Sequence, residues 1–202
     1  MIGTRTFTGP NAIATFHPMT VLPIAHMGHP ILSQIAAPVE DPTAPEIAWL
    51  IDDMIDTMND EGGVGLAAPQ IAVGLRVIVF QIPAARSGGL ELPPQALINP
   101  EITPLDDATA EAYEACLSVP GLTGPVPRWT RIAYRGFLPN GNLIEREAQG
   151  YHARVVQHEC DHLDGRLYLS RMTDIAKLAF QDELRRQSAA RARQDHQHKE
   201  TP

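Results

Sequence analysis

The stretch QHECDHLDG, Gln157–Gly165, is the part of the sequence around which the rest of the chain is arranged. Each residue of an α-helix turns by about 100°, so His158 and His162 lie within about 40° of each other and both imidazoles can bind one metal ion. Glu159 lies beside them and can take a proton from a water molecule that the metal activates. This spacing is typical of metal-dependent hydrolases and predicts a metal-binding helix.

The same helix is expected to begin at Gly150 and to end at Gly165, because glycine commonly follows the last turn of a helix. On its helical wheel Cys160 falls about 200° from His158 and points away from the metal. We therefore expect Cys160 to be a small buried hydrophobic residue and not a ligand.

Two histidines do not complete a catalytic site, because such sites use three protein ligands and leave one position for water. Tyr168 stands where one class of metalloproteases has its third histidine, which excludes that arrangement. Glu183 lies roughly 20 residues downstream, at the distance of the third ligand in another class. Cys116, in the segment YEACLSVPG, would supply a soft thiolate for iron, zinc or nickel. The residues by themselves do not decide whether Glu183 or Cys116 is the third ligand.

Composition narrows the class of protein. The chain has 202 residues, of which 44% are hydrophobic, and can bury the core of one globular domain. A net charge of −8 argues against a surface that reads nucleic acids. Two cysteines form no disulfide framework and indicate a reducing compartment. No apolar run reaches the roughly 20 residues that cross a bilayer. We therefore expect a cytoplasmic protein that acts without a membrane.

The two ends of the chain differ from its middle. Residues 1–18 are predicted to be a disordered extension, and residues 19–187 a single catalytic domain. Residues 188–202 are charged and rich in alanine and glutamine, which predicts a frayed or disordered tail.

The clearest helix apart from the metal helix precedes it in the sequence. Thr43 and Glu46 have the spacing of a capping box, and Pro45 is tolerated in a first helical turn. The helix should end at Gly62 and Gly63. Between these ends, apolar residues recur every three or four positions and predict one buried stripe. The stripe is made of Ile47, Leu50, Ile51, Met54, Ile55 and Met58.

Short β-branched or alternating segments predict strands, and a turn at Pro139–Gly141 predicts a hairpin. Residues 87–94 are rich in glycine and proline and predict a loop, and a last helix is expected from about Asp174. The predicted extended segments are 76–81, 97–102, 114–119 (ending at Pro120 and Gly121), 129–137 and 143–148.

Three motifs, taken together and in this order, resemble the signatures of the peptide deformylase family. The family patterns GxGxAAxQ, EGCLS and HExDH read here as GVGLAAPQ, EACLS and HECDH, and the resemblance extends from about Val21 to Met172. It implies an α+β fold with antiparallel strands packed around a central metal-binding helix, an N-terminal amphipathic helix and a C-terminal helix. The implied activity is removal of the formyl group from the N-terminal methionine of newly made proteins, with release of formate.

The resemblance also implies a metal site. Cys116 becomes the third ligand beside His158 and His162, and Glu183 becomes a surface residue of the last helix. The implied cofactor is one divalent ion, with Fe2+ expected in the cell and Zn2+, Ni2+ or Co2+ also able to occupy the site.

Catalytic roles follow from the same resemblance. Glu159 is the base that takes the proton of water and returns it to the departing amine. The side-chain amide of Gln70 and the backbone N–H of Leu117 are the donors for the oxyanion.

The implied partners are N-formylmethionyl peptides and nascent chains, with the ribosome near its exit as a further expectation. Val64 and Gly65 on one side and Ala115 on the other match positions that pair with the peptide as an added strand. Val155, together with His158, matches positions of an apolar pocket for the methionine side chain.

The sequence departs from the family pattern at two positions. Ala115 replaces the glycine of EGCLS, and a methyl group there would be harmful if the backbone needed φ > 0 or close approach of substrate. This substitution supports an alternative function, a catalytically weak relative that binds metal or nascent chains without useful turnover. Thr123 lies near where several bacterial members carry an arginine that anchors the peptide.

Glu114 and Arg128 match a family salt bridge that steadies the cysteine-bearing strand.

Overall fold

Two antiparallel sheets and the helices that flank them make up the computed structural model, which describes residues 20–199, with side chains through residue 190. The larger sheet has the strand order β1-β2-β3-β6-β7, and the smaller has the order β4-β5-β8. The helices are α1 (Pro45–Asp60), α2 (Ala84–Ser87), α3 (Gly150–Leu163) and α4 (Gln181–Lys199), with 3-10 turns at Pro30–Ser33, Ala68–Ile71, Tyr168–Arg171 and Ile175–Lys177. The strands are β1 (Gly65–Ala67), β2 (Val77–Ile82), β3 (Leu92–Pro104), β4 (Thr109–Cys116), β5 (Val119–Trp129), β6 (Arg131–Phe137), β7 (Leu143–Gln149) and β8 (Ala179–Phe180).

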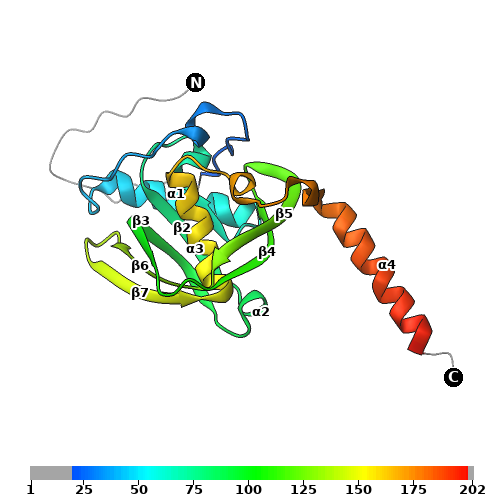
Figure 1. The fold of residues 1–202 in the computed structure, drawn as a ribbon. Helices are drawn as coiled ribbons and strands as arrows, with labels where there is room; N and C mark the ends of the chain where they lie inside the picture. The colour runs from blue at the N-terminus through cyan, green and yellow to red at the C-terminus, as the bar shows by residue number, and fades with distance from the viewer. Residues whose placement is uncertain (1–19, 200–202) are drawn as a thin grey trace.

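Strand β2 explains why the larger sheet has a helix on each face. Successive side chains of a strand point to opposite faces, and nearly every residue of β2 is buried. Ile78, Phe80 and Ile82 belong to the core that includes α3. Val77 and Val79 belong to the core that includes α1. The metal helix α3 thus lies at the centre of the molecule, between the two sheets, as the sequence predicted (Figure 1).

The predicted N-terminal amphipathic helix is confirmed, but its capping box is wrong. Helix α1 begins at Pro45 with Ala44 as its N-cap, and no side chain caps it. The hydroxyl of Thr43 instead donates to Asp41 Oδ1 at 2.7 Å, so it is used in the preceding turn. The helix ends at Asp60, and its buried residues Ile47, Ile51, Met54, Thr57 and Met58 form the stripe that packs on the sheet.

The ends of several strands differ from those that the sequence predicted. The predicted loop 87–94 is wrong at both ends, because residue 87 ends α2 and β3 already starts at Leu92. The segment 114–119 is not one extended piece, since β4 ends at Cys116 and the chain reverses before β5. Strand β5 then continues through Pro120, whose fixed φ is compatible with extended backbone, and through Gly121, whose φ of 78° a glycine adopts without strain. The hairpin of β6 and β7 is confirmed.

The C-terminal helix is confirmed, but it starts later than predicted. The segment after Asp174 first forms a 3-10 turn and then β8, which pairs with Leu122 and Thr123 of β5. Helix α4 follows at Gln181 and projects away from the sheets (Figure 1). It extends to Lys199 and therefore runs through most of the segment 188–202 that was predicted as a frayed or disordered tail. The predicted extension 1–18 lies outside the described residues, and the division into domains stays a prediction.

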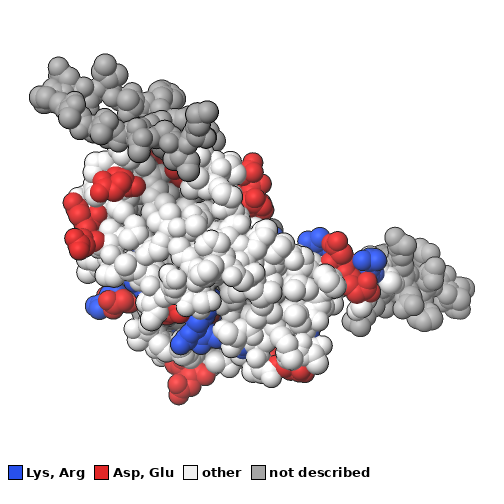
Figure 2. Space-filling view, turned by 90° about the horizontal axis from the view of Figure 1, so that it is seen from above, with Lys and Arg blue, Asp and Glu red and all other residues white. Residues whose placement is uncertain are grey.

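The surface agrees with the acidic composition. On the face in Figure 2, acidic side chains of the described residues occur in several separate groups, and no continuous basic surface is visible there. None of the helices within residues 20–199 combines the length and the apolar character needed to cross a membrane.

Candidate active site and metal centre

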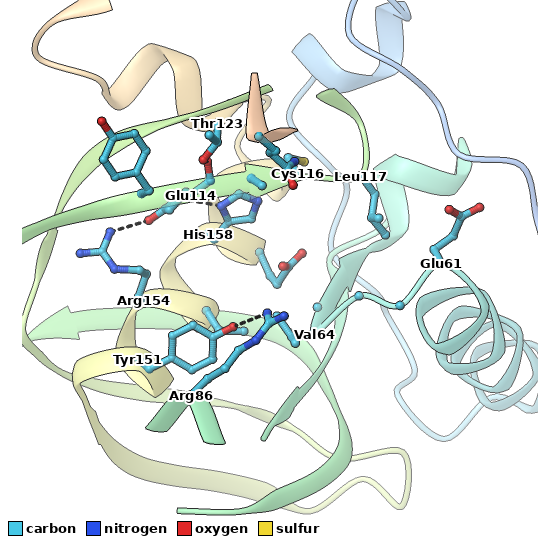
Figure 3. A pocket seen from close by; sticks show the side chains of 18 of the residues that line it. Glu61, Val64, Arg86, Glu114, Cys116, Leu117, Thr123, Tyr151, Arg154 and His158 are labelled. Atoms are coloured by element: carbon cyan, nitrogen blue, oxygen red, sulfur yellow. Dashed lines mark hydrogen bonds and ion pairs between the residues drawn. The ribbon is translucent and has the colours of Figure 1, made fainter. Parts of the chain in front are cut away.

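A cavity of about 480 Å³ lies where the edge strands of the two sheets and α3 meet (Figure 3). Strand β1 is the edge of the larger sheet and β4 the edge of the smaller one. Both edges line the cavity, β1 at Gly65 and β4 at Glu114–Cys116, and α3 contributes Val155, His158 and Glu159. Every site residue predicted from the sequence lines this cavity except His162, which lies next to Cys116.

The three predicted metal ligands come together. Potential ligand atoms of Cys116, His158 and His162 all lie within 4.8 Å of one another, and all three residues are buried. Cys116 Sγ and His162 Nε2 are 3.3 Å apart. Glu183, the alternative ligand, instead lies on α4 with its side chain about half exposed, facing Arg186 at 3.7 Å. The sulfur from the end of β4 and the two imidazoles of α3 therefore form one cluster.

The cysteine is held in the form that binds metal. Burial by itself would raise the pKa of the Cys116 thiol, but the charges and hydrogen bonds of His162 and His158 lower that pKa well below its ordinary value. Gln70 Nε2 also donates to the sulfur at 3.4 Å. A thiolate is the soft ligand that iron, zinc and nickel accept.

The histidine His158 is oriented by a buried carboxylate. His158 Nδ1 lies 2.8 Å from Glu114 Oε2, which leaves Nε2 to face the cluster. Arg128 donates twice to Glu114, at 2.9 Å each, and once to Asp161 of α3. Burial opposes ionisation of Glu114, but the hydrogen bonds from Arg128 and His158 hold its pKa well below the ordinary value. The predicted Glu114–Arg128 salt bridge is confirmed.

Glu159 lies on the cavity side of the cluster. Burial raises its pKa to about 7, which suits a group that accepts and returns a proton near neutral pH. Its Oε2 has no hydrogen-bond partner among the described residues. Its other oxygen lies so close to Gly65 that a Cβ there would be 2.2 Å away. Glycine at position 65 therefore makes room for the carboxylate.

Gln70 presents its amide N–H groups to the cluster. Its Oε1 accepts the backbone N–H of Ala67 at 2.9 Å, which fixes the amide so that Nε2 faces Cys116 Sγ and Ser118 Oγ, the latter at 3.2 Å. Leu117 follows in the turn between β4 and β5 and lines the same cavity.

The donor set fits a divalent metal ion. One thiolate and two imidazoles are the ligands of a catalytic site that keeps a fourth position for water or substrate. Within the part of the chain that the structure describes, His162 Nδ1 and Glu159 Oε2 are buried without a hydrogen-bond partner, as expected where a further polar group completes the site.

Comparison with known proteins agrees with this geometry. A family model described as polypeptide deformylase matches residues 21–178. The chain belongs to the peptide deformylase family. A peptide deformylase of Bordetella pertussis is 50% identical over 167 residues, covering 80% of this chain and 93% of that protein. One of Pseudomonas syringae pv. tomato is 52% identical over 163 residues, covering 79% and 91%.

Solved structures of deformylases share the fold. The Met-Ala-Ser bound crystal structure of the class I type b peptide deformylase from Acinetobacter baumannii matches with a TM-score of 0.72 and 37% identity, covering 76% of this chain and 99% of that one. The peptide deformylase of Thermotoga maritima matches with a TM-score of 0.70 and 37% identity, covering 77% and 99%. Family membership and the Cys–His–His cluster make this protein a metal-binding hydrolase of the deformylase family.

The departure from the deformylase motif at Ala115 causes no backbone strain. Within residues 20–199, only Ala72 and Asn99 have a positive φ without being glycine. Ala115 lies in the extended strand β4, where a methyl group is tolerated. Thr123, the second departure, uses its hydroxyl to donate to the backbone carbonyl of Glu114 at 2.7 Å.

Cys160 and Tyr168, which were assigned no ligand role, are both buried, as was expected of Cys160. Cys160 is buried in the core on the α3 face of the larger sheet, and burial raises the pKa of its thiol. Tyr168 is buried, with its ring stacked on His158 at a centroid distance of 6.3 Å, and burial raises its pKa to about 12.

Several residues around the deformylase site were missed from the sequence. Arg154 lies four residues before His158 and hence on the same helical face, a spacing that could have found it. Ser118, the last residue of EACLS, was assigned no role although its hydroxyl accepts from Gln70 Nε2. The pair of Arg86 with Tyr151 carried no sequence signal, because Arg86 comes to the cavity from the distant short helix α2.

Proposed function

We propose that this protein removes the formyl group from the N-terminal methionine of newly made proteins and releases formate. The observation that carries the proposal is the buried cluster of Cys116, His158 and His162 with Glu159 beside it, opening into a cavity between two strand edges. Membership of the deformylase family supports the same reaction.

The peptide is expected to bind as an added strand. Val64 and Gly65 on one edge and Ala115 on the other line the cavity, where the backbone of an extended peptide can pair with them. Val155, which also lines the cavity, is proposed to contact the methionine side chain. The Acinetobacter baumannii relative has a crystal structure with Met-Ala-Ser bound, which supports a peptide ligand for this protein.

Each catalytic side chain has a chemical role. A divalent ion held by the three ligands would act as a Lewis acid and lower the pKa of water from about 15.7 toward neutrality. Glu159 accepts the proton of the attacking water and passes it to the departing amine. Gln70 Nε2 and the backbone N–H of Leu117 donate to the oxyanion that develops on the formyl oxygen.

We propose Fe2+ as the ion in the cell, with Zn2+, Ni2+ or Co2+ as replacements. A thiolate with two imidazoles accepts all four of these ions, so the metal must be measured in protein purified without oxygen. Nascent chains leaving the ribosome in the cytoplasm are the proposed substrates.

The test is release of formate from formyl-Met-Ala-Ser by protein loaded with iron or nickel under anaerobic conditions. We expect turnover with wild-type protein and turnover about 10²–10⁴-fold slower with Glu159→Gln. Metal-loaded, folded protein that binds the peptide without releasing formate would reject the proposal and identify a weak relative that only binds.

A further inference from the structure

Arg154 of α3 connects the wall of the cavity to the carboxylate that orients a metal ligand. Its Nη1 donates to Glu114 Oε1 at 2.7 Å and to the backbone carbonyl of Val126 in β5 at 2.8 Å. Its Nη2 donates to the carbonyl of Ala110 in β4 at 2.7 Å. The side chain is only 12% exposed, and it lines the cavity (Figure 3).

The contacts of Glu114 show what Arg154 adds. A carboxylate offers about four acceptor sites, two on each oxygen. Oε1 accepts from Arg128 Nε and Arg154 Nη1, and Oε2 accepts from Arg128 Nη2 and lies 2.8 Å from His158 Nδ1. Arg128 holds the carboxylate from one direction and also bonds Asp161. Arg154 holds it from the side of the cavity, so the plane of the carboxylate is fixed by two guanidinium groups.

Arg154 and His158 are also neighbours on the same helix. Residues four apart lie on one face, so Arg154 and His158 approach Glu114 from successive turns of α3. The guanidinium also joins β4 and β5 through the carbonyls of Ala110 and Val126. Arg154 therefore shares with Arg128 the placement of the Glu114 carboxylate relative to the imidazole.

We propose that Arg154 is a positioning residue for the metal site, which acts through Glu114 to fix the orientation of His158. The inference rests on the proposed function only in taking the cluster as a metal site. Groups that orient metal-binding histidines typically change metal affinity or activity about 10–100-fold when they are lost.

Arg154→Met keeps most of the apolar stem of the side chain and removes its donors. We expect Co2+ affinity to fall about 10–100-fold and the visible absorption bands of the Co2+ protein to shift, because His158 is no longer held. With formyl-Met-Ala-Ser, kcat should fall more than KM rises. Arg154→Lys should recover part of the Co2+ affinity, because an ammonium group can still donate to Glu114.

Arg135→Met is the matched control, because Arg135 also pairs with a glutamate, Glu101, but both side chains are more than half exposed. It should leave Co2+ affinity and spectrum unchanged. If Arg154 only joins strands, Arg154→Met and Arg154→Lys lower the melting temperature while the folded protein keeps its Co2+ affinity and spectrum. That result would overturn the proposal.

A double-mutant cycle decides the question if Arg154→Met does not fold. Arg154→Lys is combined with Glu114→Gln, and Co2+ affinity is measured for both single variants and the double variant. We expect strong coupling, with Arg154→Lys adding little once Glu114 is changed. Additive effects would reject action through Glu114. These measurements need no formylated substrate, so they remain decisive if the protein fails to release formate.

Discussion

The floor and the rim of the cavity are built in different ways. The floor is the buried ion network of Arg128, Glu114 and Asp161, of which Glu114 lines the cavity. These side chains are 4–7% exposed, and Arg128 is hydrogen-bonded to both carboxylates. On the rim, Arg185 is 73% exposed and pairs with Asp182, which is 76% exposed. Buried charges depend on each of their partners, whereas exposed ion pairs contribute little. The comparison indicates that substitutions in the buried floor should disturb the metal site, whereas substitutions at the exposed rim should change activity and stability only slightly.

Loss of the sulfur should have the largest effect. Cys116→Ser replaces a soft thiolate with a hydroxyl, so we expect metal affinity to fall by more than about 100-fold and formate release to stop. Metal content and competition with a chromophoric chelator measure the change. Glu183→Gln is the control and should retain metal. Retention of metal by Cys116→Ser and its loss from Glu183→Gln would reverse the ligand assignment.

Removal of the base should separate catalysis from metal binding. Glu159→Gln keeps the shape of the side chain but cannot take a proton, so kcat should fall about 10²–10⁴-fold. Metal content, measured on the same sample, should stay at the wild-type level. A variant that loses its metal would show that Glu159 is a ligand.

Breaking the buried ion network should show how much the floor contributes to the stability of the fold. Arg128→Met leaves the charges of Glu114 and Asp161 without their shared partner, and we expect the free energy of unfolding to fall by about 3–5 kcal/mol. Urea unfolding measures it. The exposed pair removed by Arg135→Met should cost no more than about 1 kcal/mol. If both variants lowered the free energy of unfolding by the same amount, buried and exposed charges would contribute equally to stability, and the distinction between floor and rim would fail.

A methyl group at Gly65 should displace the base without touching the ligands. The new Cβ would lie 2.2 Å from Glu159 Oε1, so the carboxylate must move. We expect kcat to fall by up to about 100-fold, because a misplacement of about 1 Å can have that effect. Gly74→Ala, where a Cβ would have its closest neighbour at 4.0 Å, is the control. Wild-type kcat in Gly65→Ala would contradict this placement of Glu159.

The smallest effect is expected at the rim. Arg185→Gln removes an exposed charge that pairs with Asp182 and Gln181 of α4, and kcat/KM for formyl-Met-Ala-Ser should change by less than about twofold. Steady-state kinetics at two salt concentrations measure it. A loss of tenfold or more would make Arg185 part of the peptide site and would end the distinction between floor and rim.

Much of the site could be predicted because its motifs are local. The spacing of His158 and His162 fixes both imidazoles on one helical face, and the family motifs supplied Cys116 and Gln70. Arg154 was missed although it has the same helical spacing, because an arginine four residues before a ligand is usually a solvated side chain. The capping box at Thr43 failed because Asp41 competes for the hydroxyl.

The sequence by itself determined the metal helix, the amphipathic helix α1 and the residue types of the metal site, because helical periodicity relates only neighbouring residues. Tertiary structure decided that the sulfur of Cys116 lies 3.3 Å from His162 and that Glu114 faces His158. It also decided that the chain after Asp174 pairs with β5 before α4 begins. These distances join segments tens of residues apart, and they depend on how the two sheets pack around α3, which no local pattern specifies.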